Sequence, residues 1–206
     1  MKDYSTDITA ILLAGGTSSR MGGKNKALLE INGKKIIQRE LEILEGLFKE
    51  IILITNTFDQ YAFLNKPMFS DIRPGYGSLG GVYTGLINCS NEYGFVLACD
   101  MPFLNEKVIN CVCERCFGHD VTVPRIGEHY EPLHAAYSRK CVPHMEILMT
   151  RRDLRIFDFF CDVDVLEIQE EELRMMDPDL KFTLNVNSPT DFNSAIKIAK
   201  DGKYFD

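Results

Sequence analysis

The sequence lacks the features of several protein classes. No apolar run approaches the ~18 residues that a membrane-spanning helix needs. The longest candidate, residues 8–14, is interrupted by Thr9 and ends at Gly15 and Gly16. The first residues, MKDYSTD, lack the basic start and the cleavage pattern of a signal peptide. We therefore expect a soluble cytoplasmic protein that does not associate with membranes.

An excess of positive charge is also missing. Lys and Arg number 23 against 30 Asp and Glu, which gives a net charge of −7. A general nucleic-acid binder needs a basic surface to displace counterions, so we expect no nucleic-acid partner. One bound nucleotide stays compatible with this balance, because a few local cations are enough to hold its phosphates.

What is present is typical of one globular domain. The 206 residues are 45% apolar and 26% charged, which argues against disorder. This length favours one domain over residues 1–206. The seven cysteines are an odd number, and without an export signal we expect free thiols rather than a disulfide framework.

Short apolar runs alternate with helical patterns in the first half. Residues 8–14, 51–55 and 95–99 are apolar without alternation, as in strands covered on both faces. Residues 36–47 and 79–88 lie between them and have helical spacing. This order predicts an α/β fold with a mostly parallel sheet.

The second half is less regular. It predicts helices over residues 106–117, 141–149 and 154–160, and strands over 120–123, 130–137 and 162–168. Pro132 inside the second of these strands indicates a sheet edge or an irregularity. Ser188 as N-cap, Pro189 and Asp191 mark the start of a last helix.

A glycine-rich loop follows the first predicted strand. Gly15 and Gly16 allow phosphate to approach backbone N–H groups, and Arg20 and Lys26 supply positive charge. The loop fits neither G-x-G-x-x-G nor G-x-x-x-x-G-K-[ST]. Composition alone is also consistent with a flexible surface loop.

Two aspartates are candidates for ligand contacts, one after a predicted strand and one after the short run 68–70. Asp100 comes directly after residues 95–99, where a carboxylate is suited to Mg²⁺ together with substrate phosphates. Asp71 precedes a second glycine-rich stretch, and Asn56 follows residues 51–55. The alternatives are a turn or helix cap at Asp100 and an ordinary Pro-Gly turn after Asp71.

These motifs together resemble a known family. They stand in the order LAGG at 13–16, RMG at 20–22, Lys26, Asp71, GSLGG at 77–81, CDMPF at 99–103, EPL at 131–133 and NVNSPTD at 185–191. The pattern resembles nucleotidyltransferases, and among them the molybdenum cofactor guanylyltransferases of the MobA type. The resemblance implies a single-domain, Rossmann-like, three-layer α/β nucleotidyltransferase fold.

The resemblance also implies the roles of individual residues. It gives catalytic roles to Arg20, Lys26 and Asp100. The implied nucleotide contacts are Leu13, Ala14, Gly15, Gly16, Lys26, Asn56, Asp71, Gly80 and Asp100. The implied contacts to the acceptor substrate are Glu131, Asn185 and Asn187. Asp100 is the expected Mg²⁺ ligand. Arg151, Arg152 and Arg155 are further candidates for attracting an anionic pterin, although exposed arginines commonly just solvate a helix.

The implied reaction is Mg²⁺-dependent transfer of GMP from GTP to molybdopterin, with or without molybdenum, with release of pyrophosphate. Other proteins of molybdenum-cofactor synthesis are candidate partners, and we expect a monomer or a weak oligomer. Asn25 stands where the family commonly has Asp, Ser78 where Pro is usual, and Glu131 where Gln is usual. These departures leave the choice between GTP and CTP open.

Three alternatives stay open from the sequence. One is a nucleotidyltransferase for another acceptor, such as a sugar phosphate or a lipid precursor. Another is a nucleotide-binding sensor without catalysis. The third is a metal-binding module made by Cys111, Cys113, Cys116 and His119. Their spacing differs from the usual paired zinc pattern, and on a helix Cys111 and Cys113 point in different directions.

Overall fold

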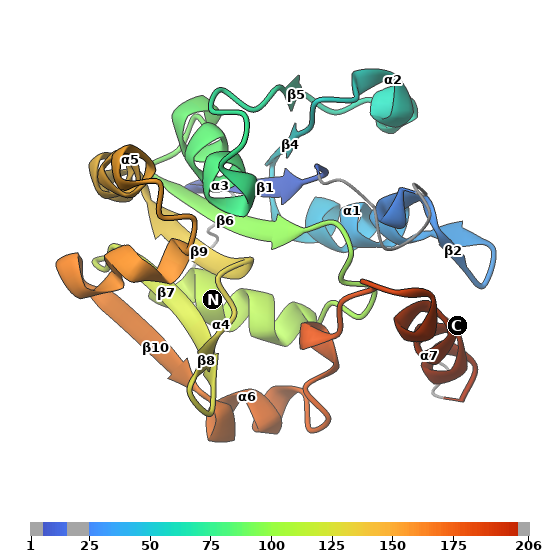
Figure 1. Cartoon of the computed structure of the whole chain (residues 1–206). Coiled ribbons are helices and arrows are strands. Elements are labelled where there is room, and N and C mark those ends of the chain that lie inside the picture. Colours follow the sequence, from blue (N-terminus) through green and yellow to red (C-terminus); the bar gives the residue numbers. More distant parts are fainter. Residues whose placement is uncertain (1–5, 16–24, 202–206) are drawn as a thin grey trace.

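A central sheet forms the middle layer of the molecule (Figure 1), for which the computed structural model describes residues 6–15 and 25–201. The strands lie in the order β10-β7-β9-β6-β1-β4-β5, with β8 paired to β7. Their bounds are β1 (Ile8–Leu13), β4 (Glu50–Ile54), β5 (Met68–Phe69), β6 (Tyr93–Ala98), β7 (Val121–Ile126), β8 (His129–Tyr130), β9 (His134–Ser138) and β10 (Val165–Gln169). Apart from β8 and β9, all of these strands run in one direction. The predicted mostly parallel sheet is confirmed.

Helices cover both faces of this sheet. The described α-helices are α1 (Ile36–Leu47), α2 (Phe58–Tyr61), α3 (Gly77–Asn88), α4 (Glu106–Arg115), α5 (Val142–Arg151), α6 (Glu170–Met176) and α7 (Pro189–Asp201), of which α1, α4 and α6 pack on one face and α3 and α5 on the other. Short 3₁₀ turns span Lys26–Leu28, Ala62–Leu64, Arg139–Cys141, Ile156–Asp162 and Lys181–Thr183. Within the described ranges, no helix combines the length and the apolar content that crossing a membrane requires.

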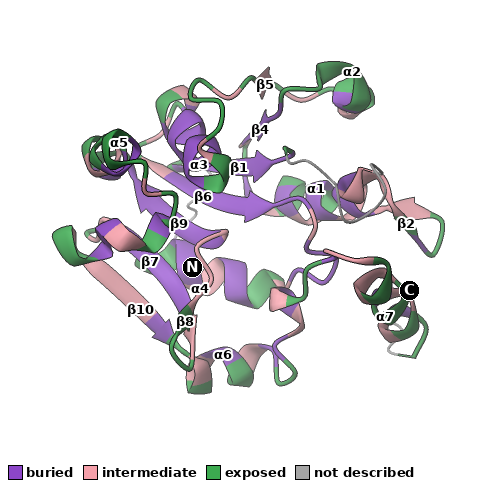
Figure 2. Cartoon of the chain, viewed as in Figure 1, coloured by how far each residue is buried: buried purple, intermediate pink, exposed green. Residues whose placement is uncertain are grey.

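The alternation of side chains along β1 separates two hydrophobic layers. Ala10 and Leu12 pack on one face of the sheet in a cluster that includes residues of α1, α4 and α6. Ile11 and Leu13 point to the other face, where they pack with residues of α3, α5 and the 3₁₀ turn Ile156–Asp162. The central strands β1, β4, β6 and β9 are accordingly buried on both sides (Figure 2), whereas most of the outer strand β10 is only partly buried. The expected three-layer fold is confirmed.

A smaller cluster lies beside the main layers. A two-stranded hairpin of β2 (Glu30–Ile31) and β3 (Lys34–Lys35) packs with α7 through Ile31, Val186 and Ala195. Asn32 and Gly33 both have positive φ, +50° and +75°, at the tip of this hairpin. Their conformation is that of a two-residue turn that favours Asn-Gly. The last helix therefore packs against the segment that follows the glycine-rich loop.

Some sequence-based boundaries are wrong. The single strand expected over 130–137 is broken by a turn around Pro132 into β8 and β9, and β9 lies inside the sheet rather than at its edge. The helix expected over 154–160 is the 3₁₀ turn Ile156–Asp162. The hairpin, α2 and α6 were not predicted. By contrast, the bounds of α1 agree with the prediction residue for residue.

Candidate active site

The carboxyl ends of several parallel strands lie side by side along one edge of the sheet. The Ala14 N–H, after β1, donates to the Ile54 carbonyl at the end of β4 (2.9 Å). On the other side of β1, the Cys99 N–H after β6 donates to the Leu13 carbonyl (3.2 Å). Open α/β sheets bind ligands at this edge. The residues that follow these strands are therefore the candidates for a site.

Lys26, Asp100 and Asn187 come together at this edge. The Lys26 Nζ lies 3.5 Å from the Asp100 Oδ2 and donates to the Asn187 Oδ1 at 2.5 Å. The Asp100 side chain is 19% exposed and that of Lys26 is 22% exposed. Burial raises the pKa of Asp100, and the Lys26 ammonium opposes this rise. A cation, a carboxylate and an amide from three separate parts of the chain thus converge.

The 3₁₀ turn Lys26–Leu28 positions the ammonium. Asn25 caps this turn, because its Oδ1 accepts the N–H of Ala27 (3.1 Å). The hydroxyl of Tyr61 donates to the same oxygen (3.1 Å), and the Asn25 amide donates to the Gln60 Oε1 (2.6 Å). Asn25 therefore holds the start of the Lys26 turn through both the oxygen and the nitrogen of its side-chain amide.

The start of α7 positions Asn187. The Asp191 Oδ2 accepts the N–H groups of Asn187 (3.0 Å) and Ser188 (2.8 Å), and the Ser188 Oγ accepts the N–H of Asp191 (3.2 Å). This is the predicted helix start, with Ser188 as its cap. Val186 is buried, whereas Asn185 is exposed. Asn187 reaches the Lys26 ammonium, whereas Asn185 faces solvent.

A buried carboxyl lies behind Asp100. Glu40 on α1 is 1% exposed, and its Oε1 accepts the N–H of Met101 (3.1 Å). Its Oε2 has no hydrogen-bond partner among the described residues. Burial raises the pKa of Glu40 well above its ordinary value. Sequence reasoning missed this residue, although a glutamate at an apolar helical position was a signal.

Asp71 belongs to a second polar cluster at the same edge. The Asn56 Oδ1 accepts the N–H of Asp71 (2.9 Å), so these two predicted nucleotide contacts are in direct contact. The Asp71 Oδ1 accepts the N–H of Arg73 (2.9 Å) and the Thr84 hydroxyl (3.3 Å). Thr84, which is fully buried on α3, also accepts the N–H of Ile72 (3.0 Å). Sequence reasoning missed Thr84, because nothing distinguishes one threonine in an apolar helix.

Gly80 lies one helical turn before Thr84 and packs directly on this cluster. A Cβ at Gly80 would lie 2.9 Å from the Arg73 carbonyl and 3.1 Å from the Asp71 Oδ2. Such distances are shorter than van der Waals contact, so only glycine allows the 71–73 turn to lie this close to α3. Gly80 therefore shapes the Asp71 turn.

Glu131 lies near the carboxyl end of β6, at the same edge as Asp100. Its backbone N–H donates to the carbonyl of Pro124 (3.0 Å). Two residues further on, the carbonyl of Leu133 accepts the N–H of Ala98 at the end of β6 (3.2 Å). The half-buried Glu131 carboxyl makes no hydrogen bond or ion pair with another described residue, and burial raises its pKa to about 7. The position is thus consistent with an acceptor contact.

The chain is similar to known proteins over most of its length. The model of the MobA-like NTP transferase domain matches residues 10–160. The chain belongs to this family. A protein described as "probable molybdenum cofactor guanylyltransferase" from Carboxydothermus hydrogenoformans is 38% identical over 192 residues, which cover 93% of this chain and 96% of the relative.

Two further relatives span nearly the whole chain. A molybdenum cofactor guanylyltransferase from Desulfosudis oleivorans is 34% identical and covers 95% of this chain and 98% of its own. The crystal structure of molybdopterin-guanine dinucleotide biosynthesis protein A from Archaeoglobus fulgidus superposes with a TM-score of 0.81 at 25% identity, over 94% of this chain and 99% of that one. The suspected family and the nucleotidyltransferase class are confirmed.

The first loop of this MobA-like transferase is described in part. Leu13 and Ala14 are buried, at 8% and 2% exposure, and Leu13 packs against Gly81 of α3. Gly15 is exposed at the end of β1. Gly16 and Arg20, which we expect to contact phosphate, lie outside the described residues. Their roles therefore stay predictions from the motif.

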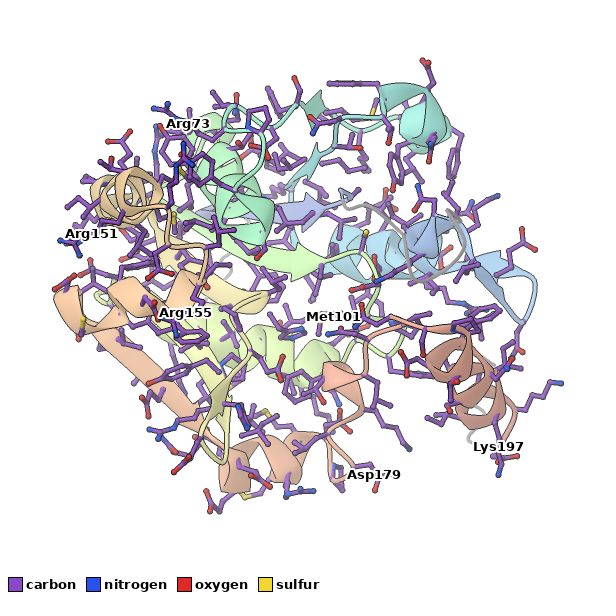
Figure 3. The ribbon with its side chains drawn as sticks, in the orientation of Figure 1. Arg73, Met101, Arg151, Arg155, Asp179 and Lys197 are labelled. Carbon is purple, nitrogen blue, oxygen red and sulfur yellow. The ribbon has the colours of Figure 1, made fainter. Side chains whose placement is uncertain are left out.

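The arginines suggested as pterin contacts lie at and after the end of α5. Arg151 and Arg152 end α5, and the exposed Arg155 pairs with Asp158 (2.8 Å). Figure 3 shows Arg151 and Arg155 on the flank near α5, whereas Met101, the neighbour of Asp100, lies nearer the middle of the molecule. That these arginines attract the pterin stays a prediction, and none of their ion pairs joins them to Lys26, Asp100 or Asn187 among the described residues.

The side chains of Cys111, Cys113, Cys116 and His119 do not form a metal-ligand group in the described structure. All seven cysteines of the protein are free thiols, as predicted. Cys113 and Cys116 are buried in the core, Cys111 lies 3.8 Å from the Glu172 Oε1, and the His119 Nδ1 lies 2.9 Å from the Asp164 Oδ2. In the described ranges, no three His, Cys, Asp or Glu side chains are grouped as metal ligands.

Proposed function

We propose that this MobA-like transferase moves GMP from GTP to molybdopterin, with or without bound molybdenum, and releases pyrophosphate. One observation supports the proposal most strongly. A single ammonium, that of Lys26, contacts both the Asp100 carboxylate and the Asn187 amide. The names of the relatives indicate the same substrates, a guanine nucleotide and the molybdenum cofactor.

The proposed reaction is an in-line phosphoryl displacement. An oxygen of the terminal phosphate of the pterin attacks the α-phosphorus of GTP, and the bond to the β-phosphate oxygen breaks. The attacking phosphate is already anionic, so no side chain needs to remove a proton. Catalysis then depends on positioning and on charge neutralisation. Lys26 and Arg20 stabilise the charge that develops on the leaving pyrophosphate.

Asp100 is the residue that we propose to hold Mg²⁺. Its carboxylate is partly exposed at the sheet edge, with the amide oxygen of Asn187 on the same ammonium. A single carboxylate at this position suits Mg²⁺, which usually takes one or two carboxylates and completes its shell with phosphate oxygens and water. When bound, the ion would supply positive charge to the phosphate oxygens of the nucleotide.

The two substrates are proposed to bind on opposite sides of Asp100. Asn56, Asp71 and Gly80 form the nucleotide side together with Gly15 and Gly16, and Leu13 and Ala14 shape its floor. Glu131, Asn185 and Asn187 form the acceptor side. Residues 1–206 would form one domain that acts as a monomer or weak oligomer in the cytoplasm, where other proteins of molybdenum-cofactor synthesis would deliver or receive the pterin.

Nucleotide choice and metal dependence test this proposal together. We expect GTP with Mg²⁺ to raise the unfolding temperature more than CTP or UTP. Molybdopterin should then trigger pyrophosphate release, and Asp100→Asn should abolish the metal-dependent part. Stabilisation by CTP or UTP but not by GTP would reject guanylyl transfer. GTP binding without pyrophosphate release in the presence of the pterin would instead indicate a sensor.

A further inference from the structure

The peptide group between Asp100 and Met101 is held from two sides. Its carbonyl, that of Asp100, accepts the N–H of Val186 (2.9 Å). Its N–H, that of Met101, donates to the Glu40 Oε1 (3.1 Å). One peptide group thus joins the loop after β6 to helix α1 and to the segment that carries Asn187.

This peptide group is shielded from water on its Glu40 side. Glu40 and Met101 are each 1% exposed, and Cys99 next to them is 9% exposed. The Met101 N–H has Glu40 as its acceptor, and a buried N–H without an acceptor is strongly unfavourable. The Glu40 carboxyl therefore determines which orientation of the Asp100–Met101 peptide is stable.

We propose that Glu40 is a positioning residue, which orients the Asp100 carboxylate toward its metal and nucleotide by fixing the Asp100–Met101 peptide against Val186. This inference rests on the proposed role of Asp100 as the Mg²⁺ ligand. Because Val186 directly precedes Asn187, the same peptide also fixes the distance between Asp100 and the acceptor segment. Groups that orient a metal ligand typically change metal affinity 10- to 100-fold when they are removed.

Two substitutions of Glu40 distinguish the effect of its hydrogen bond to Met101 from the effect of filling the same volume. Glu40→Gln keeps an oxygen that accepts the Met101 N–H, whereas Glu40→Leu keeps a similar volume without an acceptor. Glu45→Leu is the matched control, because Glu45 lies on the same helix and its half-exposed side chain pairs with Lys66 (2.7 Å) at the surface. Three readouts apply: Mn²⁺ binding in the presence of GTP without pterin, amide exchange of Met101, and the kinetics of GMP transfer.

For Glu40→Leu we expect Mn²⁺ affinity to fall about tenfold. The Met101 amide should exchange faster. At saturating Mg²⁺, the fold decrease in kcat should exceed the fold increase in the KM for GTP. Glu40→Gln and Glu45→Leu should match the unchanged protein in all three readouts. If Glu40→Leu does not fold, Glu40→Ala, which leaves room for water at the Met101 N–H, carries the same comparison.

Some results would overturn the positioning role. Unchanged Mn²⁺ affinity in a folded Glu40→Leu or Glu40→Ala variant would do so, and so would a Glu40→Gln variant as impaired as Glu40→Leu. The proposed function fails separately, if the unchanged protein transfers no GMP while the Met101 amide and Mn²⁺ binding respond to Glu40 as expected.

Discussion

Lys26 is the residue through which Asp100 and the acceptor segment meet. Its ammonium contacts both side chains, so Lys26→Met removes the charge and both contacts while keeping most of the apolar stem. We expect kcat for GMP transfer to fall by about 100-fold, in the range seen when one group that stabilises a transition state is lost. Steady-state kinetics with GTP and molybdopterin measure this.

Lys34→Met is the control for this change, because Lys34 pairs with the exposed Glu42 on the surface. It should leave kcat unchanged. A Lys26→Met variant with kcat close to that of the unchanged protein would remove Lys26 from the catalytic machinery. The unfolding temperature of both variants distinguishes an effect on chemistry from an effect on folding.

Glu131 gives the proposed acceptor side a pH dependence. Burial raises its pKa to about 7. Below this pH the carboxyl is neutral, and above it the carboxylate repels an anionic pterin phosphate. We therefore expect the KM for the pterin to rise as the pH increases from 6 to 8, and we expect Glu131→Gln to reduce that rise. Equal pH profiles for the two proteins would show that Glu131 does not face the acceptor.

At the scale of elements, one added methyl group at Gly80 tests how closely α3 packs against the Asp71 turn. Gly80→Ala would bring a Cβ to 2.9 Å from the Arg73 carbonyl, so the turn has to move. We expect the KM for GTP to rise about tenfold, since small displacements of binding groups have effects up to about 100-fold. Nucleotide titrations and steady-state kinetics measure the change.

Gly46→Ala is the matched control on α1. A Cβ at Gly46 has no neighbour within 4 Å. The substitution should leave the KM for GTP unchanged and raise the free energy of unfolding by about 0.5–1 kcal/mol, because alanine is favoured over glycine in a helix. A normal KM in Gly80→Ala would show that the Asp71 turn does not position the nucleotide.

The elements differ in how far the sequence predicts them. Helix α1 and the strands β1 and β4 were predictable, because their apolar patterns follow from burial on one helix face or on both sheet faces. The hairpin between β2 and β3 was missed, although Asn32-Gly33 is a turn signal that could have identified it. The break at Pro132 was anticipated as an irregularity, but the central place of β9 depends on pairing that no local pattern contains.

The residues of the candidate site also differ in how far the sequence predicts their positions. Asp100 follows a predicted strand, so the sequence was enough to place it at one edge of the sheet, whereas β5, which precedes Asp71, was not predicted as a strand. The contact between Lys26 and Asn187 joins segments 161 residues apart, and spacing alone could not predict it. Glu40 and Thr84 act through hydrogen bonds to backbone groups of other elements, which only the packed structure reveals.

The core as a whole contains one imidazole that resists protonation. His134 is fully buried against Phe95 and Phe182, neither ring nitrogen has a hydrogen-bond partner among the described residues, and burial lowers its pKa to about 3. The unfolded chain takes up this proton near pH 6.5, whereas the folded chain does so only near pH 3. Stability from this residue is present above pH 6.5 and declines as the pH falls toward 3.

The expected slope is up to about 1.4 kcal/mol of unfolding free energy per pH unit between these values. Urea unfolding at several pH values, compared between the unchanged protein and His134→Phe, measures it. In the variant, the free energy of unfolding should depend less on pH, by the contribution of about one proton. His129→Gln is the matched control, because it removes an imidazole from the surface rather than from the core. Identical slopes for the unchanged protein and His134→Phe would contradict the account of His134.

The charge of the whole molecule and the charge of its loop have opposite signs. The chain has a net charge of −7, yet residues 15–26 contain Arg20, Lys24 and Lys26 and no acidic residue. An acidic surface repels long polyanions, while a few local cations are enough for one nucleoside triphosphate. We therefore expect this MobA-like transferase to bind a single nucleotide and to have little affinity for long nucleic acids.

The most direct test of the central claim is the identity of the product. The protein is incubated with molybdopterin, Mg²⁺ and either GTP or CTP, and the pterin dinucleotide is identified by mass spectrometry while pyrophosphate is quantified. We predict a guanine dinucleotide formed in equal amount to pyrophosphate, and its loss in Asp100→Asn. A cytosine dinucleotide, or no dinucleotide from either nucleotide, would contradict the proposal of guanylyl transfer.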